Sequence, residues 1–153
     1  MGGSFQFKVA KESGVITYDT TGFIAGTYDV PAMTITIKTT GQRVFVGVAG
    51  ASNLSNYGDD TVTGNSHAKI KSTSVLIVVR TWAIDILRTT GVTTTTVFKF
   101  QGRYEADALE YFPVGGFYCI EKPAAGQHTY KVRLSLSLTE VVLTNAKLIV
   151  YEL

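Results

Sequence analysis

Few of the side chains that usually carry catalysis or bind metals occur in this sequence. His67 and His128 are the two histidines, and they lie far apart with no H-x-H pair. A histidine-based metal site needs clustered imidazoles and a carboxylate, so we expect none here, and we expect the His128 ring to hydrogen-bond a neighbouring loop. Cys119 is the single cysteine and has no histidine beside it to activate the thiol. We interpret it as a small buried residue on a strand.

The acidic residues follow no catalytic signature. Paired carboxylates can hydrolyse glycosidic bonds, but the pairing depends on distances in space that a sequence does not show. The candidates are scattered along the chain: Asp59, Asp60, Asp85, Glu105, Asp107 and Glu110. We therefore expect a protein that is not an enzyme and has no cofactor.

One polar loop, residues 51–67, most resembles a binding site. Asn53, Asp59 and Asp60 carry oxygen atoms of the kind that Ca²⁺ accepts, although their spacing is not that of an EF-hand. Tyr57 could stack on a sugar or pack on a partner. Asp and Asn beside Gly are also typical of any solvated turn, which is the favoured interpretation. A Ca²⁺ site is the less favoured alternative.

Charge and composition exclude some partners. The net charge is +2 and charged residues make up 17% of the chain, so no strong field is available to hold nucleic acid. The longest apolar run, residues 75–79 (VLIVV), is too short to span a bilayer. The first residues do not have the pattern of a signal peptide. We expect synthesis in the cytoplasm, no nucleic-acid partner and no membrane insertion.

The pattern of the chain is that of an all-β domain. Strands are predicted where apolar and polar residues alternate or where β-branched and aromatic residues gather. The clearest begins after Pro123, where Tyr130, Val132, Leu134, Leu136 and Leu138 share one face. We expect eight to ten strands in one domain, residues 1–153, and at most two helical turns at residues 105–111. The predicted strands are residues 4–10, 14–20, 33–40, 43–50, 73–88, 93–104, 115–121, 123–138 and 146–153.

Three of these segments are apolar on both parities, which a strand with one wet face is not. They are residues 75–79, 82–87 and 147–153. One face can line the core, and the other needs a second cover, most simply another copy of the chain. The expected contacts between copies are Trp82, Ile149, Tyr151 and Leu153, with Trp82 equally able to lie in the core. Cover by a long loop of the same chain is the alternative.

Two blocks carry a family resemblance. Residues 113–153 resemble the end of tumour-necrosis-factor-like and complement-globular-head-like jelly rolls, and look most like the versions in bacteriophage virion proteins. The matching positions lie in the corner PAAGQHTY and in the apolar last strand: Pro123, Gly126, His128, Thr129, Tyr130 and Leu148 to Leu153. Residues 30–50 resemble a strand, turn and strand of the same family. The resemblance implies a homotrimer with its terminal strands near the three-fold axis.

These observations combine into one hypothesis. The fold class is an all-β jelly-roll sandwich of two antiparallel sheets that forms trimers. The function is that of a non-enzymatic structural protein of a phage virion, which decorates a capsid or forms a tail or fibre tip. Strand-like sequence begins by Phe5 with no stalk before it, which favours a separate head. The expected partners are its own copies, other virion proteins or a host-surface glycan. The alternative is a cell-encoded carbohydrate-binding module or lectin.

Overall fold

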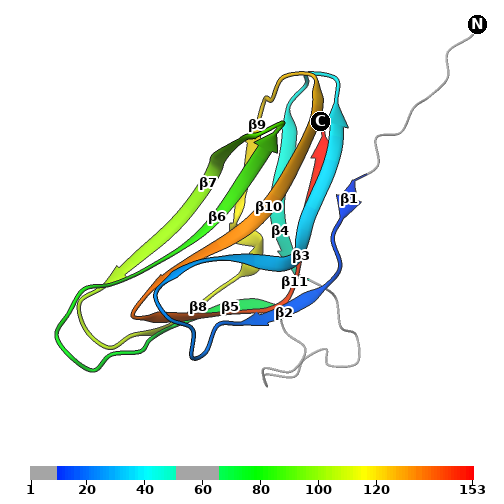
Figure 1. The fold of residues 1–153 in the computed structure, drawn as a ribbon. Coiled ribbons are helices and arrows are strands. Elements are labelled where there is room, and N and C mark those ends of the chain that lie inside the picture. Colours follow the sequence, from blue (N-terminus) through cyan, green and yellow to red (C-terminus); the bar gives the residue numbers. More distant parts are fainter. Residues whose placement is uncertain (1–9, 51–65) are drawn as a thin grey trace, which may run out of the picture.

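The computed structural model describes residues 10–50 and 66–153, and these form a β-sandwich of two antiparallel sheets (Figure 1). The predicted fold class is confirmed in this respect, and the architecture is compatible with a jelly-roll-like fold. The only helix among the described residues is one short 3-10 turn, η2 (Val114–Gly116), and none is long and apolar enough to cross a membrane. The strands are β1 (Lys11–Glu12), β2 (Ile16–Asp19), β3 (Gly26–Thr39), β4 (Val44–Gly50), β5 (His67–Ser72), β6 (Arg80–Thr90), β7 (Thr93–Tyr104), β8 (Leu109–Phe112), β9 (Tyr118–Glu121), β10 (Gly126–Ser137) and β11 (Thr139–Glu152).

The larger sheet has seven strands and is organised by β11. Its main order is β8-β5-β11-β4-β9, and β1 and β2 also pair with β11. The first half of β11 pairs with β5 and the second half with β4. The strand changes partner at Asn145, whose φ of 48° lies in the left-handed region that Asn tolerates better than most residues. The last strand therefore lies inside the sheet and not at its edge.

The smaller sheet has the order β3-β10-β6-β7. The predicted alternation of β10 is confirmed, because Tyr130, Val132, Leu134 and Leu136 are buried. Leu138, predicted to continue that face, is 43% exposed and has a φ of 55°. It lies in the turn to β11, where the backbone leaves the strand conformation.

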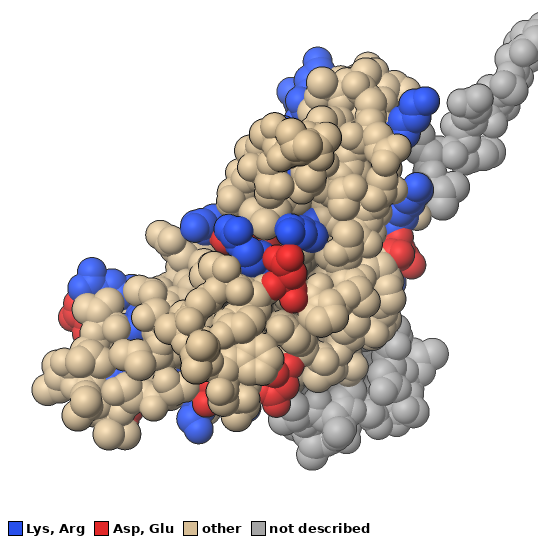
Figure 2. All heavy atoms as spheres, viewed as in Figure 1, with Lys and Arg blue, Asp and Glu red and all other residues tan. Residues whose placement is uncertain are grey.

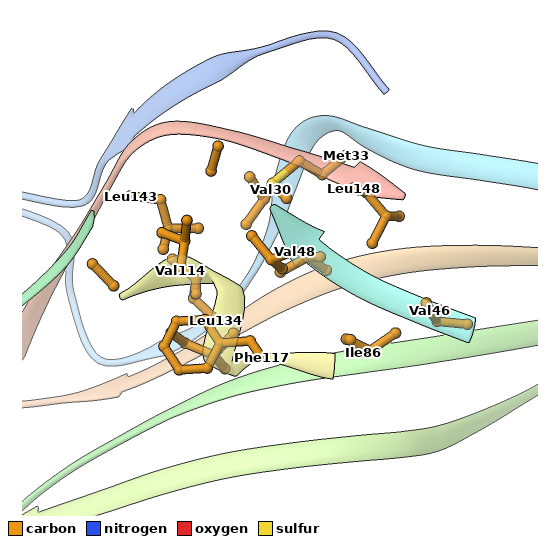
Figure 3. Close-up of a cluster of buried hydrophobic side chains, with 14 of the residues drawn as sticks. Val30, Met33, Val46, Val48, Ile86, Val114, Phe117, Leu134, Leu143 and Leu148 are labelled. Carbon is orange, nitrogen blue, oxygen red and sulfur yellow. The ribbon is translucent and has the colours of Figure 1, made fainter. Parts of the chain in front are cut away.

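The core lies between the two sheets (Figure 3). Val46, Val48 and Leu148 point inward from the larger sheet, and Ile86 and Leu134 point toward them from the smaller one. All five are buried, with at most 3% of each residue exposed. Burial of aliphatic side chains on this scale supplies most of the free energy that holds the sheets together.

The PAAGQHTY corner, residues 123–130, has a specific structural role. The His128 ring is buried, with Nδ1 2.6 Å from the Thr90 hydroxyl and Nε2 2.6 Å from the Ala124 carbonyl oxygen, which accepts its hydrogen. The buried Tyr130 hydroxyl donates to Glu121 across the sandwich. The predicted bond from His128 to a neighbouring loop is therefore confirmed. The corner ties β10 to β9 of the opposite sheet.

Two local predictions are wrong. Residues 75–79 do not form a strand buried on both faces; they lie in the exposed loop between β5 and β6. Residues 105–111 do not make helical turns, because β8 begins at Leu109 and pairs with β5. For residues 105–111, the pairing of β8 with the distant strand β5 decided the conformation. Residues 75–79 pair with no strand and are exposed.

Candidate functional site

The predicted site residues divide into three groups. Asn53, Tyr57, Asp59 and Asp60 lie outside the described residues. Trp82 lies in the chain's own core. Ile149, Tyr151 and Leu153 lie on the outer side of β11 or just beyond its end, away from the core.

Trp82 is only 3% exposed and packs against Phe100 and Phe112, with ring centroids 5.4 and 5.5 Å away. Gly102 on the neighbouring strand leaves room for the indole, since a Cβ there would lie 2.3 Å from its Nε1. A side chain buried this deeply offers almost no surface to a second copy. Of its two predicted roles, the structure places Trp82 in the core.

A stacked aromatic row runs across the outer face of the larger sheet. We define the aromatic row as Tyr118 on β9, Phe45 on β4 and Tyr151 on β11. The Phe45 ring lies between the other two, with centroids 5.6 Å from Tyr118 and 4.9 Å from Tyr151 and interplanar angles of 20° and 19°. These rings come from strands that are neighbours in the sheet but distant in the sequence.

Gly47 makes this row possible. It lies opposite both Ile149 and Tyr118 in the sheet, on the same outward face as Phe45. A Cβ at this position would lie 2.7 Å from Cβ of Tyr118 and 2.9 Å from Cζ of Phe45. The absence of a side chain lets the rings of Phe45 and Tyr118 close over the backbone.

Aliphatic side chains extend the row into a larger apolar surface. Ile120 and Leu153 are 53% and 51% exposed, and Ile149 is half-buried. Lys147 borders them and is paired with Glu12 at 3.2 Å. A flat sheet face that exposes aromatic and aliphatic groups inside a polar border has the composition of a protein interface.

Sequence reasoning found half of this surface. It singled out Ile149, Tyr151 and Leu153 because the last strand is apolar on both parities. It missed Phe45 and Tyr118, although a signal was present: Val44, Val46 and Val48 were placed on one face, so Phe45 had to lie on the other. That this face is the one shared with Tyr151 follows only from the pairing of β4 with β11.

The outer face of the smaller sheet is polar and carries a band of charges. Asp85 is completely buried there, with Oδ2 3.3 Å from an Arg133 guanidinium nitrogen and Oδ1 3.8 Å from Nζ of Lys99. Lys131 pairs with Asp29 at 3.0 Å. Figure 2 shows basic side chains gathered across the middle of this face, with acidic ones beside them.

A groove of about 410 Å³ lies on the same face. It forms because β6 and β10 place small residues opposite each other, Ala83 with Ser135 and Thr81 with Ser137. Longer side chains of β7 line its side: Lys99, Gln101 and Arg103. Hydroxyl, amide and cationic groups are suited to hydrogen-bonding a polar ligand.

The cysteine considered for catalysis does not line this groove. Cys119 is half-buried on β9, and burial, with a smaller effect of Glu121, raises the pKa of its thiol to about 11. At neutral pH it is a protonated thiol and a poor nucleophile. Within residues 10–50 and 66–153, no three His, Cys, Asp or Glu side chains lie close enough to hold a metal ion together.

The fold and these surfaces define the class: an all-β antiparallel sandwich with an apolar aromatic face on one sheet and a polar, grooved face on the other. No protein-family model matches the chain, and a search of curated proteins finds no significant match.

Proposed function

We propose that this protein is a non-enzymatic structural protein of a phage virion, a homotrimeric head that decorates a capsid or forms a tail or fibre tip. The observation that carries the self-assembly is the aromatic row with Ile149 and Leu153 on the outer face of the larger sheet. The virion assignment is supported by the resemblance of residues 30–50 and 113–153 to phage jelly rolls, which implies a trimer assembled through the terminal strands.

The physical argument for self-association is burial. Aromatic side chains bury more area than any others and anchor protein interfaces, and each exposed one that a copy covers contributes to association. Because the row includes a residue of the last strand, it lies where the resemblance places the three-fold axis. In the proposed trimer, three copies of this face cover one another.

The test is the solution mass by size exclusion with multi-angle light scattering, for the wild type and for Tyr151→Arg. We expect a trimer for the wild type and monomers for the variant, because a cation at the centre of an apolar interface lacks a partner. The control is Tyr111→Arg, since Tyr111 is a 56% exposed tyrosine on β8 of the same sheet but outside the row. A wild-type monomer, or equal masses for all three proteins, would contradict the proposed assembly.

The virion part is tested separately, by the position of the gene and by mass spectrometry of purified particles. A gene beside capsid or tail genes and the chain in washed particles would support the assignment. A gene among metabolic genes would overturn it. Repeating the mass measurement with EDTA tests the less favoured Ca²⁺ site, which predicts that the trimer is lost.

The groove on the smaller sheet favours a second candidate function, carbohydrate binding. Ser135, Ser137, Gln101 and Thr81 present hydroxyl and amide groups in one hollow, as recognition of a sugar requires. A glycan array with and without Ca²⁺ tests it, with Ser135→Trp filling the groove as the control. Hits that Ser135→Trp abolishes would favour a lectin role, and an array without hits would count against it.

A further inference from the structure

Residues 75–79 form an aliphatic tip at one end of the molecule. The loop between β5 and β6 carries these residues, at the end of the β6–β7 hairpin away from its turn (Figure 1). Ile77 is 95% exposed, Val75 85% and Leu76 67%, while Val79 and Val78 are 47% and 37% exposed. Five consecutive aliphatic residues this exposed are unusual, because a soluble surface normally scatters such residues singly.

Hydrogen bonds from the Arg80 side chain hold the loop in a defined conformation. The Arg80 side chain is completely buried, and its guanidinium donates to the carbonyl oxygens of Ser74, Leu76 and Val78, the last at 3.1 Å. The Leu76 N–H donates to the Ser74 hydroxyl oxygen at 3.2 Å, and the Val78 N–H to the Leu76 carbonyl at 2.9 Å. The arrangement shapes the loop so that its side chains point outward.

The carbonyl groups that Arg80 binds lie in an exposed loop, where water could accept this role. The loop therefore does not need the arginine while it is in water. A buried arginine that holds three carbonyl groups is costly to place, because its charge must be desolvated. Asp107, 3.6 Å away, partly balances the charge. The arrangement becomes advantageous when the tip enters a medium without water, where each unpaired carbonyl carries a large penalty.

We propose that the aliphatic tip docks on a lipid surface and inserts Val75, Leu76 and Ile77 among the lipid chains. The proposal goes beyond the proposed function and does not depend on it. Insertion from one leaflet does not require the length that spanning does, so a run of five residues suffices. This revises the expectation of no membrane insertion, which was based on the length needed to span a bilayer.

The composition of the tip favours lipid over a protein partner. Protein interfaces are anchored by Tyr, Trp and Arg, whereas this tip projects only Val, Leu and Ile. Its five aliphatic residues, of which three are more than half exposed, also present less area than the roughly 800 Å² per partner that a stable protein interface buries. Lipid chains accept such side chains without shape complementarity.

Charges beside the tip predict which lipids it accepts. Arg103 is paired with Glu105 at 3.2 Å, and Asp107 lies beside Arg80, so neither sign dominates. We therefore expect the protein to bind vesicles of uncharged phosphatidylcholine, with little dependence on salt. An anionic-lipid requirement would point to a basic patch elsewhere and would contradict docking by the tip.

The experiment is flotation with phosphatidylcholine vesicles of the full chain and two variants. Ile77→Asp places a charge at the most exposed position of the tip, and Val92→Asp makes the same change at a fully exposed valine in the β6–β7 turn, at the other end of that hairpin. We expect vesicle binding by the wild type and Val92→Asp, and a loss of about tenfold or more for Ile77→Asp. Val75→Asp serves as a second tip variant if Ile77→Asp does not fold.

Besides a requirement for anionic lipid, three results of this experiment would overturn the proposal. The wild type could fail to float, or Val92→Asp could lose binding as much as Ile77→Asp does. Alternatively, Ile77→Asp could lower the solution mass, which would show that a second copy covers the tip. This last result differs from failure of the proposed trimer, which Tyr151→Arg reports on the outer face of the larger sheet.

Discussion

The ring of Tyr151 on the last strand stacks on the ring of Phe45 on β4, with centroids 4.9 Å apart and planes inclined by 19°. The two residues are direct partners in the sheet, and both point away from the core. An aromatic pair of this kind adds about 0.5–1.5 kcal/mol beyond the area it buries. Its position on the outside of a central pair of strands is the basis for the self-association that we propose.

Replacing Gly47 with Ala should break the aromatic row. The new Cβ would lie 2.7 Å from Cβ of Tyr118, so the two strands or the rings must move apart. We expect a loss of about 1–3 kcal/mol in the free energy of unfolding, measured by urea denaturation. Gly115→Ala is the matched control, because nothing lies within 4 Å of a Cβ there. Equal stabilities of the two variants would show that the row does not depend on Gly47.

Arg80→Met should loosen the aliphatic tip. The substitution keeps a long apolar stem but removes the donors to Ser74, Leu76 and Val78. We expect faster cleavage in residues 73–79 by elastase, which cuts after small aliphatic residues, and a lower free energy of unfolding by about 1–3 kcal/mol. Arg103→Met, at an exposed ion pair, should change stability by no more than about 1 kcal/mol. Unchanged cleavage in Arg80→Met would contradict the role of the guanidinium.

Asp85→Asn tests the charged band on the smaller sheet. The side chain is completely buried beside Arg133 and Lys99, which are 31% and 47% exposed, so its removal leaves two cations without their carboxylate. We expect a loss of about 1–3 kcal/mol in the free energy of unfolding. Asp29→Asn removes the exposed partner of Lys131 and should cost less than about 1 kcal/mol. The opposite order of the two effects would show that burial does not strengthen the Asp85 pair.

Cys119 predicts a pH dependence of stability. Its pKa is raised to about 11 in the folded chain, first by burial and then by Glu121, whereas the thiol of an unfolded chain has a pKa of about 8.5. The folded state therefore holds a proton that the unfolded state releases. The resulting stabilisation is complete below the unfolded pKa and is lost as pH rises through the folded pKa. Urea denaturation from pH 8 to about 11 should show a steeper decline for the wild type than for Cys119→Ser. Parallel curves would exclude this coupling.

Alkylation of the same thiol provides an independent check. Because Cys119 is the single cysteine, iodoacetamide reports on one site. The folded protein should react much more slowly than the urea-unfolded chain at pH 8, since the thiolate fraction falls with the raised pKa. Equal rates would mean that the folded protein exposes the thiol and does not raise its pKa.

The local sequence pattern was sufficient to predict the buried face of a strand where apolar residues occupy one parity and polar residues the other. The alternation in β10 and β4 predicted which side chains are buried, because a strand with period two can hide only one face. It failed for residues 75–79, since a short apolar run is compatible with a buried strand and equally with an exposed loop. The local sequence pattern does not show that Arg80 hydrogen-bonds the carbonyl groups of this loop and so leaves its side chains exposed.

The amino-acid sequence by itself determined the all-β class and the inward faces of β4 and β10, because the faces follow from alternation along one strand. It also singled out Ile149 and Tyr151 for a second cover, because the last strand is apolar on both parities. Tertiary structure alone decided that Phe45 and Tyr118 join Tyr151, that Ala83 and Ser135 leave a groove, and that residues 75–79 project from the surface. Each of these depends on the register between strands distant in sequence, and register is set by the packing of the whole core.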